Sequence, residues 1–159
     1  RFGGKSFERY IHPKAMDNMT SIQNSMFQYL IGNTDFSVAY QHNGKLLYID
    51  KKIYPLPYDF DLCGLVDASY ATVNSRLGIK SVKDRKYRGF KREESLVQKV
   101  RNQLLKNKEE FFQIVYSQES QFEIPSEFES TTNFLTSFFD ILEDDNSFKR
   151  DVIQMMRTK

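Results

Sequence analysis

The sequence contains a single cysteine, Cys63, so no internal disulfide can form. One cysteine indicates little about the cellular compartment, and we expect it to be a small buried hydrophobic residue. Tryptophan is absent, whereas 14 Phe and 9 Tyr are present, so the core should contain aromatic rings as much as aliphatic side chains. The apolar runs extend over only a few residues, which is far too short for a membrane-spanning helix.

An excess of one charge is also lacking. The 23 basic and 21 acidic residues give a net charge of +2. Nucleic-acid-binding domains usually carry a strong positive charge, so this balance gives no reason to expect a nucleic-acid partner. The densest basic run, over residues 80–92, fits a solvated helix face better than a patch for phosphate or for an acidic partner.

The 159 residues fit one domain with a core of ordinary size. Its predicted class is α+β, mostly helical, with one small β-hairpin. We divide the domain into a lead-in (1–16), a helix followed by loops and a hairpin that carry the site (17–64), and a helical scaffold (65–159). The chain begins with Arg1 instead of Met, from which we expect a further portion upstream.

The first half of the chain predicts a helix and then a hairpin. The helix should begin at Asp17 or Asn18, both good N-caps, and end before Gly32, since glycine tolerates the backbone that stops a helix. Two short apolar runs, 46–49 and 53–56, predict antiparallel strands. Proline cannot donate to a neighbouring strand, so Pro55 and Pro57 are tolerated only at the edge of the sheet or at the end of the strand.

The second half predicts helices. Ser81 followed by Asp84 resembles a helix start, so a short helix is expected through Tyr87. Longer helices should run from Glu93, with a break near Asn107. Further helices are expected from Pro125 and from Ser147, which would cap the last one.

Four oxygen-bearing side chains stand at the ends of these first elements. Asp35 follows the first helix, Asn43 precedes the hairpin, and Asp59 and Asp61 follow it. Oxygen ligands of this kind suit a hard cation such as magnesium, and alternate residues of an extended chain face the same side, so Asp59 and Asp61 could share one. The structural alternatives are that Asp35 caps local amides and that Asn43-Gly44 is an ordinary turn pair. His42 fits a loop histidine better than a zinc ligand, because His12 is the only other histidine.

The order of these groups along the chain is similar to that in a known class of proteins. Gly32-Asn33-Thr34-Asp35, followed by Asn43, a hairpin and Asp59-Phe60-Asp61, resembles the C-terminal lobe of atypical kinase-like families of the HipA and CotH type. Residues 27–35, 42–43, 58–61 and 81–89 more closely resemble an uncharacterised, secreted family of Bacteroidota proteins. Members of that family usually have a signal peptide and an upstream β-rich half with an Arg-Gly-Asn element.

The resemblance implies a kinase-like C-lobe that uses Mg and ATP for phosphoryl or adenylyl transfer. Asp35 would then be the catalytic base, and Asn43 and Asp59 would hold the metal, with Asp61 as a second candidate. It also implies an extracytoplasmic location and a nucleotide-binding N-lobe upstream. One departure stands out: Asp35 and Asn43 are eight residues apart, against roughly five in the protein-kinase loop, so the intervening loop must bulge.

Two other functions compete with this one. The chain could be a catalytically inactive pseudokinase or an interaction module that binds a protein partner in a cell-envelope assembly through its aromatic helices. Its carboxylates could instead catalyse hydrolysis, which would require an acid of raised pKa in an apolar pocket. Fold resemblance alone does not separate these functions.

Overall fold

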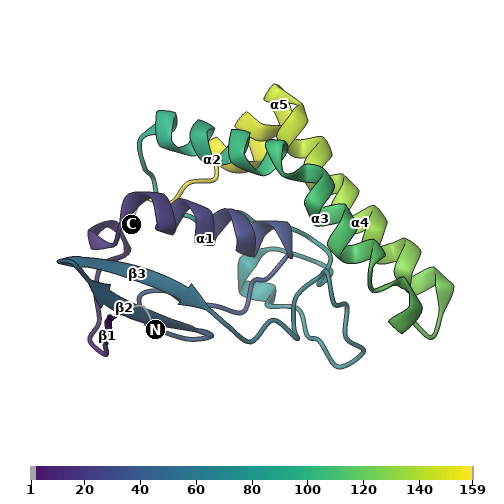
Figure 1. Cartoon of the computed structure of the whole chain (residues 1–159), viewed down its shortest axis with the longest axis horizontal. Coiled ribbons are helices and arrows are strands. Elements are labelled where there is room, and N and C mark those ends of the chain that lie inside the picture. The colour runs from purple at the N-terminus through teal and green to yellow at the C-terminus, as the bar shows by residue number, and fades with distance from the viewer. Residues whose placement is uncertain (1–2, 159) are drawn as a thin grey trace.

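Residues 3–158 are described by a computed structural model with an α+β architecture dominated by helices, as predicted (Figure 1). The helices are α1 (Asn18–Leu30), α2 (Glu94–Lys106), α3 (Lys108–Tyr116), α4 (Pro125–Glu143) and α5 (Asp145–Phe148), which continues into a π-helical turn (Lys149–Ile153). The strands are β1 (Lys5–Ser6), β2 (Gly44–Ile49) and β3 (Lys52–Pro57). Short 3-10 turns lie at Pro13–Ala15, Ser75–Leu77 and Glu119–Gln121.

The three strands form one antiparallel sheet in the order β1-β2-β3. The predicted hairpin is confirmed, and β3 lies at the sheet edge as its prolines require. Its turn contains only Asp50 and Lys51, which have φ of 49° and 64°, the left-handed backbone of the tight turns that suit the twist of a hairpin. The pairing of β1 was not predicted, because two exposed residues, Lys5 and Ser6, carry no alternating pattern.

Helix α1 lies between the sheet and α2 (Figure 1). Asp17 caps its first turn, since its carboxylate accepts a hydrogen bond from the Thr20 amide at 3.0 Å. Gly32 follows its last turn with a φ of 65°, and a β-carbon there would approach the Phe134 ring to 2.7 Å. Both the backbone and the packing therefore favour glycine, and α1 ends where the sequence predicts.

The main core fills the space between α1 and the C-terminal helices. Phe138 and Phe139 of α4 are fully buried, and Tyr29 of α1 meets Phe138 edge to face with ring centroids 6.0 Å apart. The single cysteine, Cys63, is buried in the same core, as predicted. A smaller cluster beneath the sheet contains Met16, Leu46 and Ile53.

Half-buried arginines tie the ends of helices together. Arg85 donates hydrogen bonds to the carbonyls of Tyr29 and Leu30 at the end of α1 and to the Phe134 carbonyl of α4. Its guanidinium also lies 3.6 Å from the centre of the Phe134 ring. Carbonyls at a helix end lack partners within the helix, so Arg85 satisfies them and joins α1 to α4.

The helix predicted over Ser81–Tyr87 is wrong. The carboxylate of Asp84 accepts hydrogen bonds from the amides of Lys80 and Ser81 at 2.7 and 3.0 Å, which closes a turn and not a helix. The chain then runs irregularly while Arg85 and Tyr87 turn into the core. Tertiary contacts here outweigh a local capping signal.

The helical part of the expected scaffold begins at Glu94, because residues 65–93 contain only loops and the 3-10 turn. The break at Asn107 and the start at Pro125 are confirmed. The last helix is capped by Asp144, whose carboxylate accepts from the amide of Ser147, so the cap lies three residues before the predicted one. None of the helices in residues 3–158 is both long enough and apolar enough to cross a membrane.

Candidate functional site

The end of α1 anchors both loops that carry the predicted site residues. On one side, the Asn33 amide donates to the Gln28 carbonyl at 2.8 Å, and Asp35 follows two residues later. On the other, the amides of Gly64 and Leu65 donate to the carbonyls of Gly32 and Ile31 at 3.3 and 2.9 Å. The loop that contains Asp59 and Asp61 is thereby joined to the loop that contains Asp35.

Close crossing of these loops depends on glycine. A β-carbon on Gly64 would lie 2.5 Å from the Val82 carbonyl oxygen and 2.9 Å from the Phe134 ring. Gly32 meets the same ring from the other loop. The two loops can approach to hydrogen-bonding distance because neither carries a side chain at the crossing.

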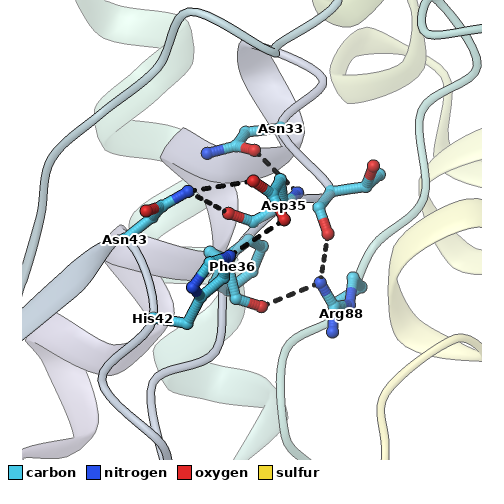
Figure 2. A network of polar contacts seen from close by, with 7 residues as sticks. Asn33, Asp35, Phe36, His42, Asn43 and Arg88 are labelled. Atoms are coloured by element: carbon cyan, nitrogen blue, oxygen red, sulfur yellow. Dashed lines mark hydrogen bonds and ion pairs between the residues drawn. The ribbon is translucent and has the colours of Figure 1, made fainter. Parts of the chain in front are cut away.

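Asp35 is held by three polar side chains (Figure 2). The Asn43 amide donates to the Asp35 backbone carbonyl at 2.8 Å and to its carboxylate at 3.0 Å. The other carboxylate oxygen lies 3.0 Å from His42 Nε2, and the Asp35 amide donates to Asn33 Oδ1 at 2.8 Å. The Asp35 side chain is still 41% exposed, so a ligand can reach it.

The loop between Asp35 and Asn43 has the bulge that their spacing requires. Ser37 and His42 exchange backbone hydrogen bonds of 2.9 and 3.0 Å, which closes a tight loop between them. Gln41 and Asn43 adopt left-handed backbone, with φ of 53° and 51°. This loop brings two residues eight positions apart into direct contact, so the larger spacing does not separate them.

Arg88 supports Asp35 from the opposite side (Figure 2). One of its guanidinium nitrogens donates to the carbonyls of Thr34 and Phe36, at 2.6 and 2.9 Å, which are the residues before and after Asp35. The guanidinium also lies 4.8 Å from the centre of the Phe36 ring. Burial lowers the pKa of Arg88, the charge of Arg157 adds to this, and the nearby Asp35 carboxylate opposes it.

Asp59 and Asp61 form a second pair. Phe60 packs edge to face on Phe27 of α1, with ring centroids 5.4 Å apart, and the two acids on either side of it are exposed. The hydrogen bond between their side chains and their mutual repulsion raise the pKa of Asp59, and the charge of Asp35 raises it further. Tyr70 donates from its hydroxyl to Asp61 at 3.2 Å.

The four predicted residues therefore lie in one region. Asn43 donates a hydrogen bond to Asp35, and the neighbouring charges of Asp61 and Asp35 both raise the pKa of Asp59. Across the described residues 3–158, no three His, Cys, Asp or Glu side chains gather closely enough to form a ready metal site.

This donor set fits magnesium better than a cation that needs a full protein cage. Mg²⁺ is usually bound through one or two carboxylates together with substrate phosphates and water. The exposed Asp59–Asp61 pair supplies two carboxylates that repel each other, and a cation between them would relieve that repulsion.

Sequence reasoning missed three contributors to this site. Asn33 lies inside the quoted Gly-Asn-Thr-Asp run, so a search for Asx turns could have found it. His42 was expected to bond to backbone; its backbone does pair with Ser37, but its ring contacts Asp35. Arg88 is 53 positions from Asp35 and belongs to the basic run 80–92. The interpretation of that run as a solvated helix face is wrong, because residues 80–92 form no helix and Arg88 is half-buried.

A scan against protein-family models, a search of curated proteins and a search of solved structures each returned no match to the chain.

Proposed function

We propose that this chain is the C-lobe of a kinase-like transferase that moves a phosphoryl or adenylyl group from Mg·ATP to a hydroxyl acceptor. The observation that carries the proposal is the double hydrogen bond from Asn43 to Asp35, with the Asp59–Asp61 pair within electrostatic range. An acid and an Asn on one loop, followed by a hairpin and a further acid, is the order of groups that phosphoryl transfer uses.

In the proposed reaction Asp35 orients the acceptor and takes its proton. Each of its carboxylate oxygens accepts one hydrogen bond, from His42 or Asn43, and has a lone pair left for an incoming hydroxyl. As the acceptor oxygen bonds to phosphorus, the bond from phosphorus to its leaving group breaks, which releases ADP in phosphoryl transfer or pyrophosphate in adenylyl transfer, and the hydroxyl proton passes to Asp35.

The metal-holding role falls to Asp59 and Asp61, with the side-chain oxygen of Asn43 as a further ligand. The Asn43 nitrogen is committed to Asp35, which leaves its oxygen free to face away from that contact (Figure 2). When bound, magnesium would neutralise phosphate charge during transfer.

Calorimetric titration of the full-length protein with ATP, with and without magnesium, tests this function. Asp59→Asn should weaken magnesium-dependent ATP binding by about tenfold or more, since it removes one of two carboxylates. Asp35→Asn should leave binding nearly unchanged and abolish transfer. Asp140→Asn, an exposed acid on α4, is the matched control. Failure of ATP to bind, or equal binding by Asp59→Asn, would refute the proposal.

A second function is favoured by one observation at the tip of the α3–α4 hairpin. Ile114, Tyr116 and Ile124 are each more than half exposed there. Such side chains can mark a surface that binds another protein, which suits an inactive interaction module in an envelope assembly. That module would bind its partner independently of ATP and lose it in Ile114→Asp, whereas Asp59→Asn would have no effect on the complex.

A further inference from the structure

A small cavity lies between α1, the hairpin and the segment that precedes α2. Its volume is about 20 Å³. Ser21 and Asn24 line it from α1, Pro55 from β3, Val38 from the loop before the hairpin, and Arg92 from the opposite side. Most of the remaining lining residues are apolar, so they offer few hydrogen-bond partners to the polar atoms in the cavity wall.

Three of those polar atoms are buried without a hydrogen-bond partner among the described residues. They are Ser21 Oγ, Asn24 Oδ1 and Arg92 Nε. Asn24 is only 8% exposed, so its oxygen cannot turn to bulk solvent. A buried donor or acceptor without a partner is costly, and most such groups in proteins bond to protein atoms or to ordered water.

The arginine donor is fixed in place. The terminal nitrogens of Arg92 donate to the carbonyls of Pro13 and Lys14, at 2.5 and 2.9 Å, and to Asn18 Oδ1 at 2.5 Å. With both terminal nitrogens committed, the planar guanidinium cannot rotate to find a partner for Nε. The remaining N–H therefore needs an acceptor within the cavity.

We propose that this cavity is a binding site for one ordered water molecule. The water would accept a hydrogen bond from Arg92 Nε and donate its two protons to Asn24 Oδ1 and Ser21 Oγ. A buried water needs roughly 10–15 Å³ of such space and two to four polar partners, and this cavity provides both.

Size also separates this cavity from its neighbour. A second cavity of about 10 Å³ is lined by Asn24, Gln28 and Asn43, and Gln28 Oε1 is also buried without a partner among the described residues. That volume lies at the lower limit for a water, so we assign the water to the larger, first cavity. The bound water joins α1 to the segment at Arg92, a contact that is independent of any catalytic role.

Nuclear magnetic resonance of the whole chain tests the site through the Arg92 Nε proton. A long-lived water should give a cross-peak between that proton and water. Asn24→Leu replaces the amide with methyl groups of the same branching, so it removes one of the water's acceptors and should abolish the cross-peak. Gln28→Met, which removes an acceptor lining only the second cavity, is the matched control and should retain it.

A crystal structure at a resolution that shows waters is the second measurement, and it stands even if Asn24→Leu fails to fold. We expect a density peak within hydrogen-bonding distance of Arg92 Nε, Asn24 Oδ1 and Ser21 Oγ. An empty cavity, or a direct hydrogen bond from Arg92 Nε to Asn24, would overturn the proposal, as would a cross-peak that persists in Asn24→Leu.

Discussion

The helical scaffold and the site loops are held in place by different forces. Phe138 and Phe139 of α4 have no exposed surface and are fixed by packing. Asp35, by contrast, is fixed by hydrogen bonds from Asn43 and Arg88 to it or to its neighbours, and it remains accessible. Global stability and site geometry should therefore respond to different substitutions.

Truncation of the scaffold should cost the most. Phe138→Ala removes a fully buried ring and leaves a cavity, so we expect a loss of about 3–5 kcal/mol in the free energy of unfolding. Urea denaturation measures it. The exposed Ile114→Ala should cost far less. A loss below roughly 1 kcal/mol for Phe138→Ala would contradict a core fixed by packing.

Arg88 joins the two regions, so its removal should affect both. Arg88→Met loses the hydrogen bonds to Thr34 and Phe36, and we expect a loss of roughly 1.5–3 kcal/mol. The side-chain amide resonances of Asn43 should also shift as Asp35 moves. Arg88→Lys keeps the charge and should retain more of both. Unchanged Asn43 resonances in Arg88→Met would mean that Arg88 does not position Asp35.

Two substitutions of Asn43 distinguish the effect of its backbone conformation from the effect of its side-chain hydrogen bonds. Asn43→Ala loses two hydrogen bonds and places a less tolerant residue at a φ of 51°, so it should cost about 1–2 kcal/mol. Asn43→Gly loses the same hydrogen bonds but accepts that φ readily. Thermal unfolding should therefore rank glycine above alanine. The reverse ranking would show that the left-handed backbone contributes no strain.

The cap of α1 gives a pH-dependent effect. Burial acts to raise the pKa of Asp17, but hydrogen bonds from Thr20 and the ion pair with Lys52 outweigh it, and the pKa is lowered. The stabilisation is thus present at neutral pH and is lost as pH falls through the lowered pKa. Asp17→Ala should cost about 1 kcal/mol at pH 7 and progressively less below pH ~4. Denaturation at both pH values checks this, and a pH-independent cost would contradict it.

The smallest effect on stability should come from the exposed acid pair. Asp61→Asn removes the repulsion and the carboxyl contact that raise the pKa of Asp59, so that pKa should fall toward its ordinary value. Because the pKa of Asp59 is raised in the wild type, Asp59 should become protonated at a higher pH there than in the Asp61→Asn variant. Carboxyl resonances of Asp59 in a pH titration would show the change, and Asp140→Asn is the control. An unshifted titration would mean that the acids do not interact.

The sequence predicted much of the fold, because several residues have strong local preferences. Gly32 ended α1, the prolines put β3 at the edge, and Pro125 opened α4. The failures were tertiary in origin. The signal at Ser81 closed a turn because Arg85 was drawn into the core.

For the site, the sequence supplied the residues but not their arrangement. The sequence predicted that Asp59 and Asp61 would share a side if the chain were extended, but Asp59 has left-handed backbone with a φ of 63°, so simple alternation does not describe this segment. The contact between Asn43 and Asp35 depends on left-handed backbone at Gln41 and Asn43; asparagine tolerates that backbone, but glutamine at position 41 gives no such signal. The support by Arg88 depends on the whole fold, which brings distant segments together.

The crossing of Gly32 and Gly64 has a consequence for how this architecture could diversify. The loops before and after the β2–β3 hairpin are both hydrogen-bonded at the end of α1. The spacing between the two acidic loops therefore does not depend on the length of the strands between them. Insertions at the Asp50-Lys51 tip could therefore accumulate without altering that spacing, whereas a single methyl group at either glycine would disturb it.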